Sequence, residues 1–358
     1  MKNLFMIHTP YHLLLSIAII LDKQLCDNDI LIYDDLDINN LDMDKLSKIF
    51  MYIIYYNNNK KNYSFIEKLK NIYSNRLRKK KIRTLINFDY EKVFIFNDSI
   101  IETQYIINKL YKNSDIIYVE DGSVIYLDTF KLHKNGSIIS KLKKYLLYGF
   151  DYEYIYNAYG IHSKIDKKMV TWPDLICNDF KTDGKPITEI KKSVLIDSIR
   201  YLYGDMTKLI NLKQDEHIIL IILEHVDFFK RNDNISINDF ENYVEFILSN
   251  LSDCYDIYVK YHPRDDSKYL QSLSEKYKIN FIEKDIPVEV FYVNDEVYVL
   301  SITSTALFTA KKILDNSNVI SLCKLLCLKD LDIINKFEKI NIKLPSNDKE
   351  LLECFKVL

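Results

Sequence analysis

Short apolar runs alternate with longer amphipathic stretches along two parts of the chain. In the first part, the predicted strands are residues 4–7, 29–33, 92–96 and 115–119, and the predicted helices are residues 11–21, 42–55, 65–80 and 99–111. In the second part, the predicted strands are residues 217–223, 257–260, 279–282, 296–300 and 319–322, and the predicted helices are residues 237–248, 267–277, 288–292, 304–314 and 347–355. Such alternation is typical of parallel, doubly wound α/β sheets.

Between residues 129 and 191 this periodicity weakens, and glycines and the pair Trp172 and Pro173 interrupt it. We interpret this stretch as the end of a first domain and its connection to a second. With 358 residues, the chain is long enough for two domains of ordinary size. The sequence therefore predicts two Rossmann-like lobes, residues 1–190 and residues 191–358, with a ligand site in the cleft between them.

Composition and charge narrow the class of protein. Hydrophobic residues make up 48% of the chain, which is enough for two cores, and the net charge of -2 gives no indication of nucleic-acid binding. The six cysteines lie in or beside apolar runs and form no Cys-x-x-Cys pair. We therefore expect buried structural thiols in a reducing cytoplasm and no zinc site.

The sequence predicts a cytoplasmic location. It shows no secretory signal of the usual form, and its longest apolar run, residues 13–21, is too short to span a bilayer. A basic run covers residues 76–83, and a basic and aromatic segment covers residues 142–150. The first is either a solvated helix face or a contact with anionic lipid or an anionic acceptor, and the second would add to such a peripheral membrane contact.

A His-Pro step, His262 and Pro263, follows the apolar strand 256–260. Proline stops the strand and keeps the preceding residue extended, so His262 is expected at the strand tip. Ligands bind at that edge of open α/β sheets, and imidazole exchanges a proton near neutral pH. His262 is thus a candidate acid, and a solvated turn is the alternative.

Two carboxylates, Glu120 and Asp121, followed by Gly122, come directly after strand 115–119. An acidic pair at a strand tip is a candidate general base. Asp and Gly are also the usual residues of an ordinary turn between a strand and a helix. Both interpretations stay open at this point.

Hydroxyl residues follow strand 296–300 and lead into a helix; they are Ser301, Thr303, Ser304 and Thr305. Hydroxyls and free N–H groups at such a place bind phosphate, although a plain helix cap explains them equally well. Upstream, Pro287 starts a short helix with Glu289 in its first turn. That carboxylate would accept hydrogen bonds from a ribose, or it would only stabilise the helix through a favourable interaction with the helix dipole.

The first predicted strand turns into the first helix at His8, Thr9, Pro10, Tyr11 and His12. Thr9 is a candidate N-cap, and Pro10 suits the first helical position. The turn lacks the GxGxxG fingerprint, so no dinucleotide is indicated. It would place two imidazoles at the cleft edge of the first lobe, unless His12 is an ordinary residue of the first helical turn.

Taken together, these motifs resemble those of bacterial sialyltransferases. Those enzymes share an acidic-acidic-Gly motif, a His-Pro motif and a Ser-Ser/Thr motif, which match Glu120–Gly122, His262–Pro263 and Ser304–Thr305 in the same order. The opening at residues 9–15, TPYHLLL, is also similar. The resemblance is to the lipooligosaccharide and capsule sialyltransferases of glycosyltransferase family 52, with motif-level likeness to families 38 and 80.

The resemblance implies a GT-B-like fold and an inverting transferase that uses CMP-sialic acid, with no cofactor and no metal. His262 would protonate the departing CMP and, with the helix N-terminus, replace a cation. The other donor-side residues would be Pro263, Glu289, Thr303, Ser304 and Thr305. Tyr11, His12, Glu120 and Gly122 would line the acceptor side, where a terminal galactose of a surface glycan is expected.

Several questions stay open at this stage. The family often carries a second acidic-Gly segment, which Asp233 approximates with Asn234 in place of the glycine, so Asp121 and Asp233 are alternative bases. The linkage, a homodimer and a membrane contact are not fixed by the sequence. A GT-B transferase that uses a UDP-sugar and a non-catalytic, two-lobed nucleotide- or sugar-binding protein are the alternative functions.

Overall fold

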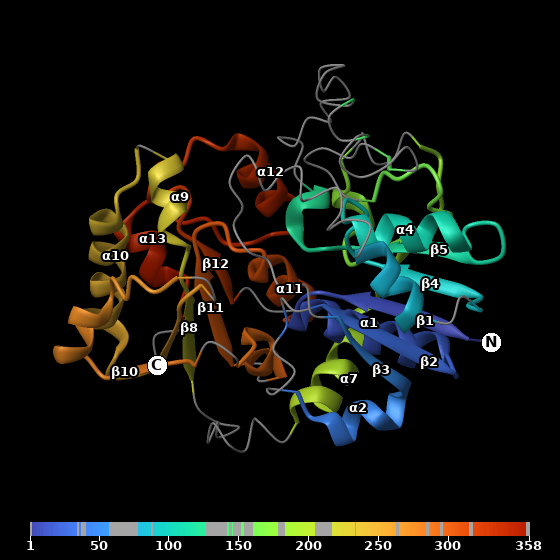
Figure 1. The fold of residues 1–358 in the computed structure, drawn as a ribbon. Helices are drawn as coiled ribbons and strands as arrows, with labels where there is room; N and C mark the ends of the chain where they lie inside the picture. The colour runs from blue at the N-terminus through green and yellow to red at the C-terminus, as the bar shows by residue number, and fades with distance from the viewer. Residues whose placement is uncertain are drawn as a thin grey trace, which may run out of the picture. The chain divides into compact units, whose positions relative to one another are not determined.

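Two separate parallel sheets form the framework of the protein (Figure 1). The computed structural model describes residues 2–33, 36, 41–56, 78–86, 89–126, 142, 145, 152–153, 160–177, 183–204, 217–232, 234–262, 265–283, 286–293, 296–314 and 318–355. The chain divides into two units, Met1–Ser198 and Ile199–Leu358. The prediction of an α/β protein with two Rossmann-like sheets is confirmed.

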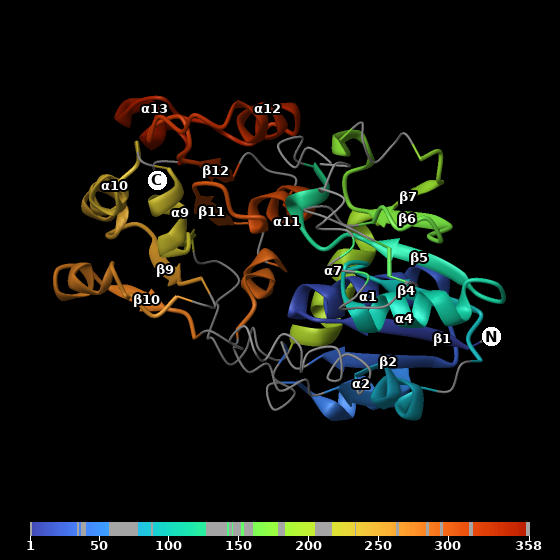
Figure 2. The ribbon, with the colours of Figure 1, turned by 45° about the horizontal axis from the view of Figure 1, so that its top comes forward.

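In the first unit, the described strands have the order β3-β2-β1-β4-β5-β6-β7, and every adjacent pair is parallel. Figure 2 shows this order from β2 to β7. The strands are β1 Asn3–Ile7, β2 Asn28–Tyr33, β3 Phe50–Tyr56, β4 Lys92–Ile95, β5 Asp115–Val119, β6 Lys167–Val170 and β7 Ile187–Glu189. The helices are α1 Pro10–Lys23, α2 Met43–Ile49, α4 Ile101–Leu110 and α7 Lys192–Tyr203, with 3-10 turns η2 Ser123–Tyr126 and η3 Pro173–Leu175.

Local sequence explains the start of this unit. Every residue of β1 and β2 is buried, as expected for central strands of a parallel sheet that is covered on both faces. Helix α1 then begins as predicted: Thr9 accepts the backbone N–H of His12 at 3.2 Å, and Pro10 occupies the first helical position. The cap fixes the angle at which α1 leaves the tip of β1.

In the second unit, the described strands have the order β10-β9-β8-β11-β12, again all parallel. They are β8 Ile218–Ile222, β9 Asp256–Lys260, β10 Ile279–Phe281, β11 Val297–Ser301 and β12 Val319–Ser321. The helices are α9 Val226–Arg231, α10 Ile237–Leu251, α11 Ala306–Ile313, α12 Leu331–Lys339 and α13 Asp348–Glu353, with 3-10 turns η4 Gln271–Glu275 and η5 Val288–Val293. Because β8 lies between β9 and β11, the segments after these three strands emerge side by side.

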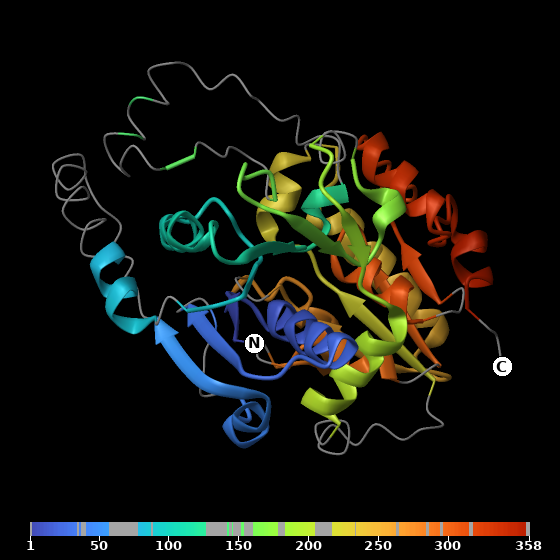
Figure 3. The same cartoon turned by 90° about the vertical axis from the view of Figure 1, so that its right-hand side faces the viewer.

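Several predicted elements are wrong or incomplete. The helix predicted for residues 42–55 is the short helix α2 followed directly by β3, because the aromatic and β-branched run from Phe50 favours a strand. Residues 267–277 contain only η4, and β6, β7 and α9 were not predicted. Residues 57–77 lie outside the described residues, but residues 78–85 are helical, and this helix lies beside the tip of β3 (Figure 3).

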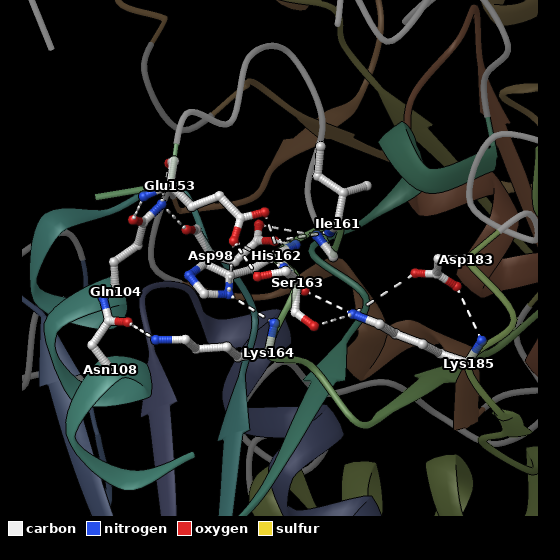
Figure 4. Close-up of polar contacts among 11 residues, drawn as sticks. Asp98, Gln104, Asn108, Glu153, Ile161, His162, Ser163, Lys164, Asp183 and Lys185 are labelled. Atoms are coloured by element: carbon white, nitrogen blue, oxygen red, sulfur yellow. Dashed lines mark hydrogen bonds and ion pairs between the residues drawn. The ribbon is translucent and has the colours of Figure 1, made fainter. Parts of the chain in front are cut away.

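A buried carboxylate anchors the segment that leads into β6 (Figure 4). Asp98, just after β4, accepts the backbone N–H groups of Gly160, Ile161 and His162, each at 2.9 Å. Gly160 has a φ of 74°, and a Cβ there would lie 2.6 Å from the Tyr118 ring, so the turn requires glycine. Burial raises the pKa of Asp98 to about 6.

Two further expectations concern the thiols and the membrane. Cys177, Cys323 and Cys354 are buried, but Cys26, Cys254 and Cys327 are exposed, so the expectation that all six are buried is wrong. Cys26 and Cys254 follow the ends of α1 and α10, and Cys327 lies in the turn after β12. At such places apolar neighbours in sequence do not guarantee burial. Among the described residues, every helix falls short of the length and apolar character needed to cross a bilayer.

Candidate active site

The two carboxylates after β5, those of Glu120 and Asp121, differ in burial and in hydrogen-bond partners. Glu120 is 1% exposed and accepts hydrogen bonds from Tyr11 Oη at 2.5 Å, from Thr171 N at 2.7 Å and from the hydroxyl of Tyr126. Burial raises the pKa of its carboxyl, and these hydrogen bonds oppose the shift. Glu120 therefore ties the strand tip to α1 and to the residue after β6.

Asp121 keeps partial access to solvent, with 18% of its side chain exposed. Its Oδ1 atom lies 2.5 Å from Nε2 of His12, and its Oδ2 atom lies 3.5 Å from Nδ2 of Asn97. Gly122 follows with a φ of 109°, a backbone conformation that glycine adopts without strain. The turn thus buries one carboxylate and presents the other, as a base would require.

The protonation of His12 follows from its second contact. Nδ1 of His12 accepts the backbone N–H of His8 at 3.1 Å, so the ring proton of a neutral imidazole lies on Nε2 and is donated to Asp121. The ring is 1% exposed and stacks on Phe96 at 4.3 Å, and burial lowers its pKa. A neutral, rigidly held imidazole therefore orients the Asp121 carboxylate.

In the second unit, the hydroxyl segment after β11 is already engaged by a carboxylate that the sequence did not single out. Oε1 of Glu224, at the tip of β8, accepts the N–H of Thr303 at 2.6 Å and lies 3.2 Å from its hydroxyl. The hydroxyl of Ser301 donates to the backbone oxygen of Ile222 at 2.6 Å. Glu224 thereby fixes the path of this segment at the tip of β8.

Ser304 and Thr305 follow the engaged residues. Ser304 Oγ accepts the N–H of Ala306 at 3.3 Å, whereas Thr305, in the N-cap position of α11, makes no side-chain capping bond and is exposed. An N-cap role thus explains Ser304 in part and does not explain the Thr305 hydroxyl. The phosphate interpretation of the pair stays a prediction.

The remaining predicted residues are spread over this unit. His262 follows β9 and makes a perpendicular ring contact of 5.3 Å with His225, which follows β8. Glu289 lies in the first turn of η5, and burial raises the pKa of its carboxyl while Lys260 opposes the shift. Pro263 and Asp233 lie outside the described residues, so the choice between Asp121 and Asp233 stays open.

The predicted basic runs are only partly described. Within residues 76–83, Arg78 binds the buried Glu102 of α4, with Nη2 2.7 Å from Oε2, so this arginine is not a solvated charge. Of residues 142–150, the structure describes only 142 and 145. Among the described residues, no cluster of three His, Cys, Asp or Glu side chains is placed to hold a metal ion.

His12, Glu224 and His225 share one sequence signal. Each follows an apolar strand, just as the motif residues do, because strand tips meet at one edge of a parallel sheet. The sequence singled out His12 but not its contact with Asp121, and it predicted strand 217–223 without indicating a role for Glu224 or His225. Pairing across 109 residues in the chain becomes visible only in the fold.

Comparisons with known proteins agree with this fold. The model of the family described as "Alpha-2,8-polysialyltransferase (POLYST)" matches residues 3–323. No curated protein matches. Two solved sialyltransferases are similar. The alpha/beta-galactoside alpha-2,3-sialyltransferase of Photobacterium phosphoreum has 15% identity and a TM-score of 0.55, and the match covers 96% of this chain and 98% of that one. A sialyltransferase of Photobacterium damsela has 14% identity and a TM-score of 0.52, and the match covers 98% of this chain and 80% of that one.

The UDP-GlcNAc 2-epimerase of Neisseria meningitidis is similar as well, with 13% identity, TM-score 0.55 and coverage of 99% of each chain. At such identities the solved structures show the fold alone, which is the GT-B type of two parallel-sheet units. The match of the family model to residues 3–323 shows that the protein is a glycosyltransferase of the sialyltransferase class. Since the family model covers most of the chain, the protein belongs to the alpha-2,8-polysialyltransferase family. This confirms the resemblance to bacterial sialyltransferases and sets the non-catalytic alternative aside.

Proposed function

We propose that the protein transfers sialic acid from CMP-sialic acid to a sugar hydroxyl, with inversion and without a metal. The observation that carries the proposal is the Asp121 carboxylate, which is partly exposed at the tip of β5 and held by the Nε2–H of His12 at 2.5 Å. Oδ1 is held by His12, whereas Oδ2 has only the long 3.5 Å bond from Asn97 and is therefore the oxygen we assign to accept a proton. The family match supplies the reaction class.

The proposed reaction is a single displacement. Asp121 takes the proton of the acceptor hydroxyl, whose oxygen forms a bond with the anomeric carbon of sialic acid. The bond from that carbon to the CMP phosphate oxygen breaks, and His262 donates a proton to the departing phosphate. Attack opposite the leaving group inverts the anomeric configuration.

The second unit provides the donor side in this proposal. We assign the hydroxyls of Ser304 and Thr305 to the CMP phosphate. The backbone N–H of Thr303 already donates to Glu224, so Thr303 holds the hydroxyl segment in place and its backbone does not donate to the phosphate. Glu289 is assigned to the ribose, and Pro263 to the orientation of His262. Charge neutralisation by these donors replaces a metal ion.

Two acceptors are candidates. A terminal galactose was expected from the sequence motifs, and the relative from Photobacterium phosphoreum is named as a galactoside transferase. The family description instead names alpha-2,8-polysialyl transfer, which points to a hydroxyl of a terminal sialic acid. A galactoside and its sialylated derivative, each offered with CMP-sialic acid, separate the two by the mass of the product.

A nucleotide screen tests the donor. Calorimetry with CMP and UDP should show binding of CMP and none of UDP, because the proposal assigns the second unit to a cytidine nucleotide. Binding of UDP without binding of CMP would favour the UDP-sugar alternative. The measurement needs no acceptor, so it tests the donor independently of the acceptor question.

A further inference from the structure

The tip of β8 lies between the two predicted donor motifs. Strand β8 pairs with β9 on one side, where Ile222 lies opposite Lys260, and with β11 on the other, where Ile221 lies opposite Leu300. The residues that follow these strands therefore leave the sheet at one edge. His225, three residues past Ile222, emerges between the His262 segment and the hydroxyl segment.

A buried carboxylate holds the two histidines together. Asp265 is 3% exposed; its Oδ2 atom accepts the N–H of Val226 at 2.9 Å, and its own N–H donates to the backbone oxygen of His262 at 2.8 Å. Its Oδ1 atom also accepts the N–H of Ser267 at 2.8 Å. Asp265 thus links the backbone next to His225 with the backbone of His262, and the two rings lie 5.3 Å apart.

One ring nitrogen of His225 accepts a hydrogen bond within the protein, and the other can donate one to a ligand. Nδ1 accepts the N–H of Asp227 at 3.1 Å, so the proton of the neutral ring lies on Nε2, which acts as a donor. The Oδ2 atom of Asp227 also lies 3.6 Å from Nδ1. Within the described parts of the chain Nε2 has no hydrogen-bond partner, and 29% of the side chain is exposed.

We propose that His225 is a second imidazole of the donor site, which donates its Nε2–H to the phosphate of the nucleotide beside His262. The inference rests on the proposed use of a CMP-sugar. Two imidazoles at adjacent strand tips would donate hydrogen bonds to one anionic phosphate from two directions, since their ring planes are 80° apart. His225 is then a binding residue in its own right.

The variant that separates binding from structure is His225→Asn. Asparagine keeps an acceptor for the N–H of Asp227 and is a favoured cap, but it lacks the distal donor. His217→Asn is the matched control, because His217 lies at the opposite end of β8 and is equally exposed, at 29%. Calorimetry on the full-length chain would measure binding of CMP and of cytidine, which has no phosphate.

For His225→Asn, we expect CMP to bind about 10-fold more weakly, as for a lost hydrogen bond to a charged group, with cytidine binding and thermal stability unchanged. His217→Asn should match the wild type. A His225→Asn, His262→Asn double variant should lose less than the product of the two single losses, because both groups hold one phosphate. Wild-type affinity for CMP in His225→Asn, or an equal loss for cytidine, would overturn the inference. Failure of the wild type to bind CMP would instead reject the proposed donor, and the inference with it.

Discussion

The Nε2–H of His12 is directed at Oδ1 of Asp121 over 2.5 Å, and the backbone N–H of His8 at 3.1 Å from Nδ1 determines which nitrogen carries the proton. The ring is buried against Phe96 and the carboxylate is partly exposed. The pair thus has a buried member, His12, that orients the carboxylate, and a partly exposed member, Asp121, that meets the acceptor in the proposed reaction.

Asp121→Asn tests the base. The change keeps the size of the side chain and removes its basicity, so kcat should fall about 10²–10⁴-fold, while CMP affinity stays constant because the acid serves the acceptor. Steady-state kinetics and CMP calorimetry measure the two quantities. Asp233→Asn is the comparison, and its kcat should fall only slightly. A large fall in kcat for Asp233→Asn with a small one for Asp121→Asn would assign the base to Asp233. Full activity in both variants would contradict a carboxylate base.

Two variants test His12 as a positioning residue. His12→Phe keeps a ring for stacking on Phe96 but has no N–H for Asp121, so kcat should fall by about 10-fold or more with an unchanged donor KM. His12→Gln retains a donor at a similar reach and should recover part of kcat. Equal kcat in the two variants, or a change in donor KM alone, contradicts a role through Asp121.

Ser304 and Thr305 are tested by a double change to alanine. If they donate to the CMP phosphate, donor KM should rise and CMP should bind about 10-fold more weakly, as for lost bonds to a charged group. A helix-cap role predicts instead a loss of about 1 kcal/mol in the free energy of unfolding, with donor KM unchanged. Kinetics and urea unfolding of the same samples decide between the two.

The buried His162 should make folding sensitive to acid (Figure 4). Burial lowers the pKa of this imidazole to about 4, from an ordinary value of 6.5. Because the unfolded chain binds the proton more readily, stability is lost as the pH falls from about 6.5 to about 4, by up to about 3 kcal/mol. His162→Asn keeps an acceptor for the N–H of Lys164 and should flatten this dependence.

Urea unfolding of the wild type and of His162→Asn at several pH values measures the effect. Asp98, with a pKa near 6, contributes with the opposite sign, since a raised acid pKa favours folding at low pH. It is present in both proteins, so its contribution cancels in the difference. Parallel pH curves for the two proteins would show that His162 is not the acid-sensitive group.

The fold could be predicted where strands are continuously apolar, as in β1 and β8, because such runs have few alternatives. β6 was missed because it begins with two lysines. Lys168 is 0% exposed and is tolerated there because its Nζ atom lies 2.7 Å from Oδ2 of Asp183. Such a pairing across a loop leaves no periodic trace in the sequence.

The candidate site was predictable as a set of strand tips but not as a set of contacts. Motif order led to Asp121, His262 and Ser304. The burial of Glu120 beside an accessible Asp121 depends on Thr171, 51 residues away in the chain, which no local pattern reveals. The engagement of Thr303 by Glu224 is likewise a product of strand order.

The central claim is transfer of sialic acid from CMP-sialic acid with Asp121 as the base. The most direct measurement is mass spectrometry of the glycan product after the purified chain is incubated with CMP-sialic acid and either a galactoside or a sialylated galactoside, in excess EDTA. The account predicts a product heavier by one or more sialic acid residues with the wild type, and almost none with Asp121→Asn. Absence of a sialylated product with the wild type and both acceptors, or an undiminished product with Asp121→Asn, would contradict it.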